Sequence, residues 1–388
     1  MAIEGFIENG ELVIELPEEC IQIKQIARDF AIKNIDPYRL EWDEKNFFPV
    51  ETLREMGKLG LLGIIIPQEW GGAGLSYMAY VSAIAEIASH CGAIGLSMAA
   101  HTSLCTNHIN LWGNNHQKEK YLKKLAKGEY IGCWALSEPE TGSDAFSMKT
   151  TAEFKNGKWI LNGVKAWATH GISADVYVIF AALKGVQNKK ERVCAFIVEK
   201  GTKGLIPAKK ENKMGMRASE TAQIILDNCE VPEDNLIGKA GTGMKQALTV
   251  LNGGRISIAA LATGIARGAF EIALQYAKTR VQFDVPIIQH QAIGFKLANM
   301  YVRLRASELL TYRAAYLMDN NSLEPAFASM AKYYSSETAT WLTDEAIQIL
   351  GGNGYVKEYL VEKFHRDAKL CTIGEGTSEI QKLNIAKY

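Results

Sequence analysis

The sequence predicts a mostly α-helical protein with a β domain in its middle third. The first and last thirds carry apolar residues at helical spacing, and the last third adds long alanine-rich stretches. The middle third has tight-turn signals between short β-branched and aromatic runs. A chain of 388 residues is long enough for two or three domains. We therefore expect an N-terminal α-helical domain over residues 1–130, a β domain over 131–243 and an α-helical bundle over 244–388.

Charge and cysteine content exclude several classes of protein. Lys plus Arg and Asp plus Glu both number 43, so binding to nucleic acid driven by bulk charge is not expected. Seven cysteines cannot all pair, and none forms a C-x-x-C motif, so we expect free thiols in a reducing cytoplasm and no metal site. The chain starts with Glu4, Glu8 and Glu11 instead of a basic region, and it has no long apolar run. We therefore expect neither a signal peptide nor a membrane span.

The first third has two short apolar stripes at helical spacing, followed by a longer helical stretch. The stripes comprise Ile21, Ile26, Ala27 and Phe30, then Leu53, Met56 and Leu59. Residues 67–74 read Pro-Gln-Glu-Trp-Gly-Gly-Ala-Gly and interrupt the helical pattern. This glycine run lacks the Lys-Ser/Thr and the βαβ context of a phosphate loop, so we expect a structural turn. Helical character resumes over 79–94 and continues to about 125.

The middle third predicts hairpins. Asn156-Gly157 and Asn162-Gly163 are tight-turn signals, and they flank a short strand over 158–161. Further strands are expected over 164–169, 176–181, 193–198 and 223–226. No G-x-G-x-x-G follows a strand at a helix start, so a Rossmann-type fold is not expected.

The last third predicts long helices. Apolar residues over 248–270 support one helix despite the Gly253-Gly254 pair, and residues 293–318 and 326–350 support two more. Long apolar helices rich in alanine indicate a bundle.

One carboxylate near the end of the chain has the surroundings of a catalytic base. Residues 373–378 read Ile-Gly-Glu-Gly-Thr-Ser, which places Glu375 between Gly374 and Gly376. Glycines let the backbone approach a ligand closely while the single acid points at it. Such a carboxylate suits removal of a proton next to a carbonyl. Ser378 with Gln381 also fits a capping box at the start of a helix.

A loop between the helical and β regions offers a second binding segment. Residues 135–144 read Ala-Leu-Ser-Glu-Pro-Glu-Thr-Gly-Ser-Asp, with hydroxyls, a glycine bend and amides that can hydrogen-bond a ligand. Taken alone, the segment also reads as a capped loop.

Four segments, in their order and spacing, resemble the acyl-CoA dehydrogenase family, and the resemblance spans nearly the whole chain. They are residues 134–144; Trp-Ala-Thr-His-Gly at 167–171; Arg-Val-Gln-Phe-Asp-Val-Pro-Ile at 280–287, then Gln291; and 348–378, which begins Gln-Ile-Leu-Gly-Gly-Asn-Gly-Tyr. The resemblance implies an N-terminal helical domain, a middle β-barrel or sandwich and a C-terminal four-helix bundle, with FAD as cofactor. Four positions depart from the family pattern: Thr141, His170, Asn252 and Asp284. His170 replaces a common Asn, and a structural role and a redox-modulating role both stay open for it.

The resemblance also implies roles for individual residues. Glu375 is the expected base, which takes the α-proton while flavin N5 takes the β-hydride. The expected FAD-binding residues are Trp134, Leu136, Ser137, Gly142, Ser143, Trp167, Thr169, Arg280, Phe283, Gln291, Gln348, Gly352, Thr377 and Glu379. Arg280, Gln348 and Gly352 are expected to reach the flavin of a neighbouring subunit. The expected substrate-binding residues are Ser143, Leu96, Ala100, Arg255, Gly374 and Gly376.

The resemblance implies α,β-dehydrogenation of an acyl-CoA in a homo-oligomer, expected to be a tetramer, with electron-transferring flavoprotein as acceptor. The expected location is the cytoplasm, or the mitochondrial matrix for a eukaryotic protein. Gly374 stands where linear-chain members often have Tyr, and Gly254 where some branched-chain members carry the base. A short branched or cyclic acyl group is therefore the expected substrate. A straight butyryl-type substrate, an acyl-CoA oxidase and a non-catalytic flavin scaffold are the alternatives.

Overall fold

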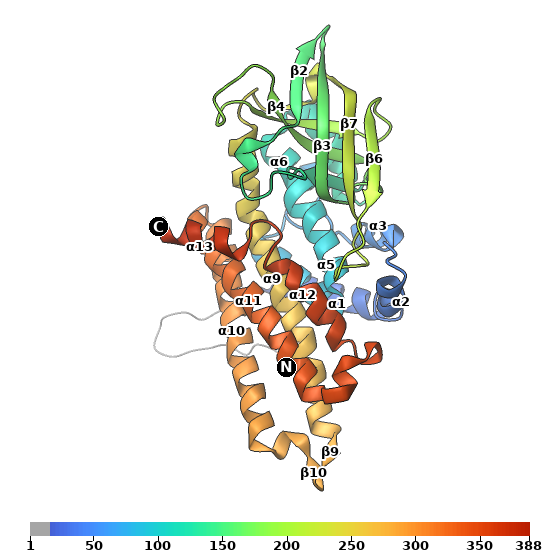
Figure 1. The fold of residues 1–388 in the computed structure, drawn as a ribbon, viewed down its shortest axis with the longest axis vertical. Helices are drawn as coiled ribbons and strands as arrows, with labels where there is room; N and C mark the ends of the chain where they lie inside the picture. Colours follow the sequence, from blue (N-terminus) through green and yellow to red (C-terminus); the bar gives the residue numbers. More distant parts are fainter. Residues whose placement is uncertain (1–15) are drawn as a thin grey trace.

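One long helix, α9 (Gly243–Thr279), runs through the molecule and sets its layout. The computed structural model describes residues 16–388, so the acidic start with Glu4, Glu8 and Glu11 lies outside the described residues. At 1.5 Å per residue, α9 is about 55 Å long. It leads from the β domain at the top of Figure 1 to a small hairpin at the bottom.

The N-terminal part is helical, as predicted. Its elements are α1 (Glu18–Asn34), α2 (Arg39–Glu44), α3 (Val50–Lys58), η1 (Gln68–Trp70), α4 (Tyr77–His90), α5 (Gly92–Ala99), the π-helix η2 (Ala100–Thr106), α6 (Asn107–Trp112), α7 (Asn115–Gln117), the π-helix η3 (Lys118–Leu122) and α8 (Lys123–Ala126). The two stripes predicted at helical spacing lie on α1 and at α3, although Ile21, Ile26 and Leu59 are exposed. Cys20 and Ile23 take part in the buried face of α1 instead. The glycine run forms a turn, with Gly71 at φ 82° directly after η1.

The middle part is an eight-stranded sheet in the order β6-β7-β3-β2-β4-β5-β8, with β1 pairing to β4. The strands are β1 (Gly132–Ala135), β2 (Thr151–Lys155), β3 (Lys158–Thr169), β4 (Val176–Leu183), β5 (Val193–Glu199), β6 (Leu205–Lys210), β7 (Thr221–Pro232) and β8 (Leu236–Ile237). Alternate residues of β4 face two different apolar clusters, so this strand is buried on both faces. That burial accounts for its unbroken apolar sequence.

The two Asn-Gly pairs have different structures. Asn156 (φ 51°) and Gly157 (φ 74°) form the predicted tight turn between β2 and β3. The predicted turn at Asn162-Gly163 is wrong, since β3 continues through it. The pairing of β3 with β7 shifts between Leu161 and Gly163, which marks a β-bulge. A Cβ at 163 would lie 2.5 Å from the hydroxyl of Thr150, so the bulge needs glycine.

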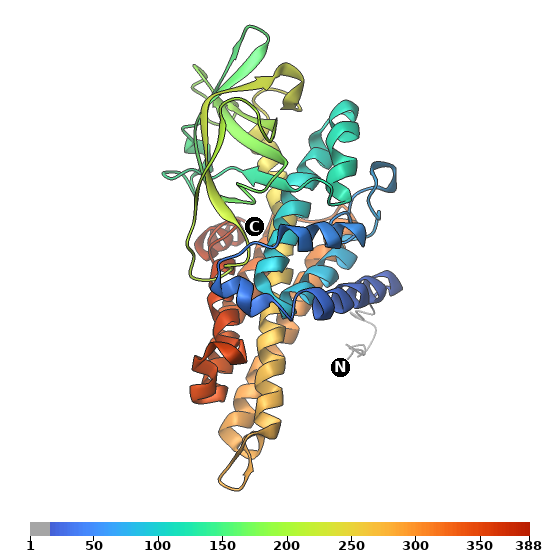
Figure 2. The same cartoon turned by 90° about the vertical axis from the view of Figure 1, so that its right-hand side faces the viewer.

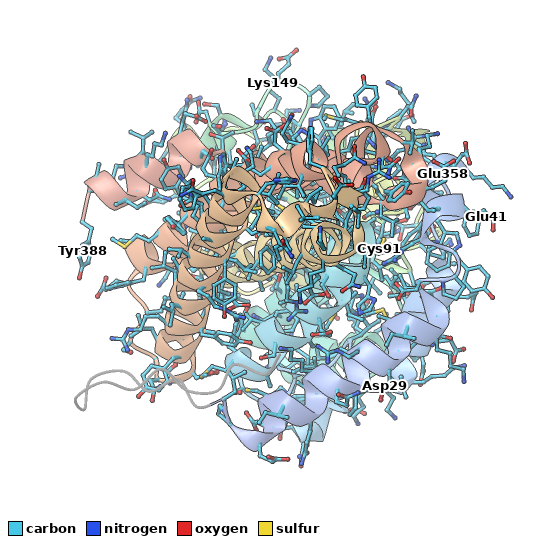
Figure 3. The ribbon with its side chains drawn as sticks, turned by 90° about the horizontal axis from the view of Figure 1, so that it is seen from below. Asp29, Glu41, Cys91, Lys149, Glu358 and Tyr388 are labelled. Carbon is cyan, nitrogen blue, oxygen red and sulfur yellow. The ribbon has the colours of Figure 1, made fainter. Side chains whose placement is uncertain are left out.

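The C-terminal part packs α9 with α10 (Gln291–Asp319), α11 (Pro325–Leu350), α12 (Val361–Cys371) and α13 (Ser378–Ala386). The hairpin β9 (Val281–Gln282) and β10 (Val285–Pro286) joins α9 to α10. The three predicted long helices are confirmed, and the Gly253-Gly254 pair does not interrupt α9. Figure 2 shows the N-terminal helices stacked beside this bundle. In Figure 3 the molecule is seen from below: Cys91, between α4 and α5, lies in its interior, and Asp29 and Glu41 project outward.

Burial explains two further features of composition. Among the described residues, α9 alone is long and apolar enough to cross a membrane, yet 83% of its most apolar window is buried inside the protein. The core helix of a folded protein meets the same criterion. All seven cysteines are free and buried, which confirms the expectation of free thiols.

Candidate active site

The turn between α12 and α13 presents Glu375 to the interior. Glu375 (φ 54°) and Gly376 (φ 95°) are both left-handed, a conformation that strains a non-glycine residue. Lys332 of α11 donates from Nζ to the Gly376 carbonyl at 2.7 Å. Gln381 donates to the same carbonyl at 2.8 Å and to that of Glu375 at 3.3 Å. These two side chains hold the strained turn in place.

The Glu375 carboxylate lies against helix α9 at Gly254. A Cβ added at 254 would overlap Glu375 Oε2, and it would lie 3.1 Å from Leu104 Cδ2. Oε2 is buried and has no hydrogen-bond partner among the described residues. Gly254 therefore makes the space that the carboxylate occupies beside an apolar neighbour.

Burial dominates the electrostatics of this carboxylate. It raises the pKa of Glu375 to about 7, against the opposing effect of the positive charges of Lys332 and Arg255. Arg255 is itself buried; its Nη1 donates to Asn252 Oδ1 at 2.9 Å, while its Nε has no partner in the described chain. Burial likewise lowers the pKa of Lys332 to about 8. A carboxylate with a pKa near neutrality suits general-base catalysis.

Tyr77 is a site residue that sequence reasoning missed. A Cβ at Gly253 would overlap its hydroxyl, which is buried and unpaired within residues 16–388. Tyr77 and Glu375 thus pack on neighbouring glycines of α9. The Gly253-Gly254 pair inside a long apolar helix was the available signal, because such a pair marks close approach by other groups.

The backbone around Glu375 also leaves a hydrogen-bond donor without a partner in the described range 16–388. The Glu375 N–H donates to no residue in the described range 16–388. The capping-box prediction for Ser378 is wrong: Thr377 is the N-cap of α13, and its side chain accepts from Ile380 N. Ser378 instead donates to Glu337, and Glu379 is exposed in the first turn of α13. Thr377 therefore has a structural role in the turn that carries Glu375.

An apolar cluster adjoins Glu375 at Gly254. It contains Ala100, Leu104 and Val250, with Trp134 and Leu251 packed against them. Ala100 begins the π-helix η2, a form of helix that is frequent at functional sites. Leu104 connects this cluster to Glu375 through its approach to Gly254. Leu96, the other predicted acyl-contacting residue, belongs to the main helical core.

The loop after β1 is fixed by a buried ion pair that sequence reasoning also missed. Lys165 of β3 donates to Glu138 at 2.8 Å and to the Leu136 carbonyl at 3.1 Å. Ala166 N donates to the Ser137 carbonyl at 2.9 Å. Burial opposes charge on Glu138, but Lys165 and backbone donors hold its pKa below the usual value. Hydrogen bonds from Lys165 and Ala166 of β3 thus hold Leu136 and Ser137, which are predicted to contact the flavin.

The middle domain offers groups that fit an extended polar ligand such as FAD. The Thr141 hydroxyl is buried and unpaired in the described structure. Next to it, Gly142 and Ser143 are exposed, and a Cβ at Gly142 would meet no neighbour. Trp167 is 63% exposed although it is aromatic. Thr169, at the end of the same strand, is half-buried. An unpaired hydroxyl and a bare indole are what a bound flavin would cover.

His170 has a structural role. It is buried, at φ 62°, a conformation that Asn also tolerates. Its Nδ1 donates to the Gly132 carbonyl at 3.0 Å, and its ring stacks on Phe48 with centroids 5.1 Å apart. The residue ties the end of β3 to the start of β1.

Five predicted FAD-binding residues lie elsewhere. Arg280, Phe283 and Gln291 flank or form the exposed hairpin at the bottom of Figure 1, where Phe283 is 88% exposed. Gln348 and Gly352 lie at the same end, since Asn353 donates to Tyr276 near the end of α9. Arg280 follows α9 directly and lies 26 positions after Gly254, so at 1.5 Å per residue it is about 39 Å along the helix from the place where Glu375 packs.

The hairpin turn explains one departure from the family pattern. Phe283 (φ 55°) and Asp284 (φ 65°) are both left-handed. Glycine is favoured at such positions, and Asp is among the residues that tolerate them. Asp284 therefore adopts, in this chain, the left-handed conformation for which glycine is favoured.

This fold, with the Glu375 carboxylate held against α9 beside an apolar cluster, is that of a flavin-dependent dehydrogenase. The chain belongs to the acyl-CoA dehydrogenase family: models of the N-terminal, middle and C-terminal domains of acyl-CoA dehydrogenase match residues 17–129, 133–229 and 241–388. An acyl-CoA dehydrogenase of Bacillus subtilis is 46% identical over 97% of this chain and 99% of its own length. The mitochondrial short-chain specific acyl-CoA dehydrogenase of Rattus norvegicus is 44% identical over 97% and 91%.

Solved structures agree with this assignment. Butyryl-CoA dehydrogenase from Megasphaera elsdenii has a TM-score of 0.95 at 36% identity, covering 97% of this chain and 99% of that one. A structure described with the electron transferring flavoprotein of Acidaminococcus fermentans has a TM-score of 0.95 at 39% identity, with coverage of 97% and 99%. An acyl-CoA dehydrogenase complexed with FAD from Bacillus anthracis has a TM-score of 0.91 at 35% identity, with coverage of 96% and 67%. The cofactor is FAD, and the substrate is an acyl-CoA.

Proposed function

We propose that the protein oxidises a short branched or cyclic acyl-CoA to the 2-enoyl-CoA with Glu375 as the α-proton base. The observation that carries the proposal is the Glu375 carboxylate, whose Oε2 is buried, unpaired within residues 16–388 and held against Gly254 next to an apolar cluster. A base in this setting is close to apolar substrate atoms and has a pKa near the working pH.

The protein's own groups have distinct tasks in this reaction. Glu375 removes the α-proton, and its free N–H is available to bind the thioester oxygen as negative charge develops there. Lys332 and Gln381 hold the turn that aligns the carboxylate and the N–H. When bound, FAD supplies the acceptor for the β-hydride. Leu136, Ser137, Thr141, Trp167 and Thr169 would hold it on the middle domain.

Two glycines support a branched or cyclic acyl group. Because Gly254 has no side chain, the Glu375 carboxylate can occupy the space beside it. Gly374, directly before Glu375, has no side chain either. An aromatic at 374 would narrow the surroundings of the reacting carbons. Without it, a substituent beside the chain of the substrate fits more readily.

The distance between the base and Arg280 supports a site shared between subunits. Arg280 and Gln348 lie at the far end of the bundle, beyond the reach of any side chain near Glu375. We therefore propose a homotetramer in which Arg280, Gln348 and Gly352 of one copy, with Phe283 and Gln291, bind the flavin of another. Electron-transferring flavoprotein is the proposed acceptor. The proposed location is the cytoplasm or the mitochondrial matrix.

A straight short-chain substrate is the second candidate. It is favoured by the names of two relatives, the short-chain specific rat enzyme and the Megasphaera butyryl-CoA dehydrogenase. Anaerobic bleaching of the flavin by a panel of butyryl-, isovaleryl- and cyclohexanecarbonyl-CoA tests both. Fastest bleaching by a branched or cyclic ester supports the first proposal, and fastest bleaching by butyryl-CoA supports the second. Rapid oxygen consumption by the reduced enzyme would indicate an oxidase, and no bleaching by any ester would indicate a scaffold.

A further inference from the structure

A chain of buried hydrogen bonds leads from the Trp134 indole to the end of the sheet. Trp134 Nε1 donates to His108 Nδ1 at 3.1 Å. His108 Nε2 is 2.9 Å from Gln246 Oε1. Gln246 Nε2 in turn donates to the Ile237 carbonyl at 2.9 Å. The chain joins four elements: β1, α6, α9 and β8.

The direction of every bond in this chain is forced. An indole N–H can only donate, so His108 Nδ1 accepts and the imidazole carries its proton on Nε2. A peptide carbonyl can only accept, so the amide nitrogen of Gln246 faces Ile237 and its oxygen faces His108. His108 is thereby limited to one neutral tautomer and one ring orientation.

Burial protects this arrangement. His108 and Gln246 are both 0% exposed. The ring of Phe180 meets both partners edge-on, with centroids 5.4 Å from His108 and 4.9 Å from Trp134. Burial also lowers the pKa of His108 to about 4, so the ring stays neutral above that pH. An imidazolium would turn an N–H toward the indole N–H and break the chain.

The indole that His108 holds belongs to the candidate site. Trp134 packs against the cluster of Ala100, Leu104 and Val250, and Leu104 adjoins Glu375 through Gly254. Trp134 also lies two residues before Leu136, at the start of the loop proposed to contact the flavin. An indole that rotates here would change both the acyl cluster and the flavin surroundings.

We propose that His108 is a positioning residue that locks the Trp134 indole in the wall shared by the acyl group and the flavin. This proposal rests on the proposed function, because it assigns a task to Trp134 in that reaction. His101, a second buried histidine inside the π-helix η2, differs: among the described residues its ring bonds only backbone groups, the Leu125 carbonyl and the Gly132 N–H. His108 therefore orients the side chain of Trp134, whereas His101 orients backbone groups.

The test compares variants of the holoenzyme by the visible circular dichroism of bound flavin, its reduction potential and the rate of anaerobic bleaching. His108→Leu should keep FAD, alter the flavin spectrum and slow bleaching roughly fivefold, the effect of losing one buried hydrogen bond. His108→Asn, which retains an acceptor for the indole, should restore much of the rate. Gln246→Leu removes the partner of His108 and should change the flavin spectrum in the same sense. It replaces His108→Leu as the test variant if His108→Leu does not fold.

A coupling measurement separates positioning from stability. In a Trp134→Phe background, where no indole N–H remains, His108→Leu should change the spectrum and the rate no further. Gln117→Leu is the matched control, because Gln117 is a buried amide that donates to the carbonyls of Asp234 and Leu236 and, within residues 16–388, makes no hydrogen bond to Trp134. It should lower the melting temperature and leave the flavin signals unchanged.

Two outcomes would overturn the proposal. One is a His108→Leu enzyme with a lower melting temperature but unaltered flavin spectrum and bleaching rate, which would make His108 structural only. The other is an equal effect of His108→Leu with and without the Trp134 indole. If the unmodified enzyme is bleached by no acyl-CoA, the proposed function fails instead, and the flavin spectrum still reports whether His108 positions Trp134.

Discussion

Glu375 and Gly254 occupy one space: the carboxylate oxygen Oε2 lies where a side chain on residue 254 would begin. Residue 254 is the position at which some branched-chain members of the family are expected to carry the base. A base at 375 in this conformation therefore requires glycine at 254, and the two locations for the base exclude each other sterically.

Gly254→Ala should displace the base. The added methyl group overlaps Oε2, and a shift of about 1 Å in a catalytic group can cost about 100-fold in rate. We expect kcat/KM to fall to that extent while FAD is retained. Gly264→Ala is the control, because Gly264 is also on α9 but packs against α4. A methyl group there clashes with the Ala85 carbonyl of α4, and Glu375 is not among the atoms nearest to it. It should lower the melting temperature with little change in rate per bound flavin. A Gly254→Ala enzyme at full rate would refute the position given to the carboxylate.

Glu375→Gln should remove the base with little change in shape. FAD and acyl-CoA should still bind, but the flavin should be reduced about 10²–10⁴-fold more slowly, as is typical for loss of one general base. Stopped-flow reduction under anaerobic conditions measures this. Reduction within a few-fold of the normal rate would show that another group takes the proton.

The pH profile should report the same carboxylate. Only the deprotonated form accepts a proton, and burial raises the pKa of Glu375 to about 7. We therefore expect kcat/KM to rise with pH below about 7 and to level off above it. Lys332→Met removes a positive charge that lowers this pKa, so the rise should move to higher pH. A profile already level at pH 5 would contradict the assignment.

The sequence predicted the elements better than the contacts between them. Periodicity located the long helices over 293–318 and 326–350 because their length and alanine content leave few alternatives. The turn signal failed at Asn162-Gly163. The same dipeptide forms a turn at Asn156-Gly157, but at 162–163 it lies in a β-bulge whose glycine packs against Thr150. Turn signals are local, and the crowding that selects a bulge comes from a neighbouring strand.

The site shows the same limit. Glu375 could be found from its flanking glycines, because they are adjacent in sequence. Lys332 and Tyr77 could not, since Lys332 reaches the Gly376 carbonyl from α11 and Tyr77 reaches Gly253 from α4 through tertiary packing alone. His108 gave no sequence signal either, because a lone buried histidine resembles any core residue until its partners Trp134 and Gln246 are placed.

Arg280→Ala should weaken FAD binding without disturbing the fold. Loss of a charge-assisted hydrogen bond costs about 1.5–3 kcal/mol, which corresponds to roughly 10- to 100-fold in affinity. Flavin loss during gel filtration measures it, and Lys278→Ala, an exposed cation two residues earlier, is the control. If Arg280 acts on another subunit, mixed oligomers of Arg280→Ala and Glu375→Gln chains contain intact sites and should recover activity. No recovery on mixing, after exchange of subunits is verified, would place Arg280 and Glu375 in the same site.

Gly374→Tyr should change which substrates are accepted. A Cβ at 374 meets only Leu370, at 3.6 Å or more, so the backbone tolerates a side chain there. The ring would then fill space beside the reacting carbons, and a clash in a packed site costs about 1–3 kcal/mol. We expect kcat/KM for isovaleryl- and cyclohexanecarbonyl-CoA to fall roughly tenfold or more, with a smaller loss for butyryl-CoA, whose straight chain can pass the ring.

The ratio of the two rates is the quantity to measure for this variant, because a tyrosine next to Glu375 can also slow all substrates alike. Gly374→Ala is the matched control: it adds a side chain at the same position without a ring, and it should leave the ratio unchanged. Equal losses for straight and branched esters in Gly374→Tyr would refute the open space beside the base. Selectivity would then have to arise in the apolar cluster around Ala100 and Leu104.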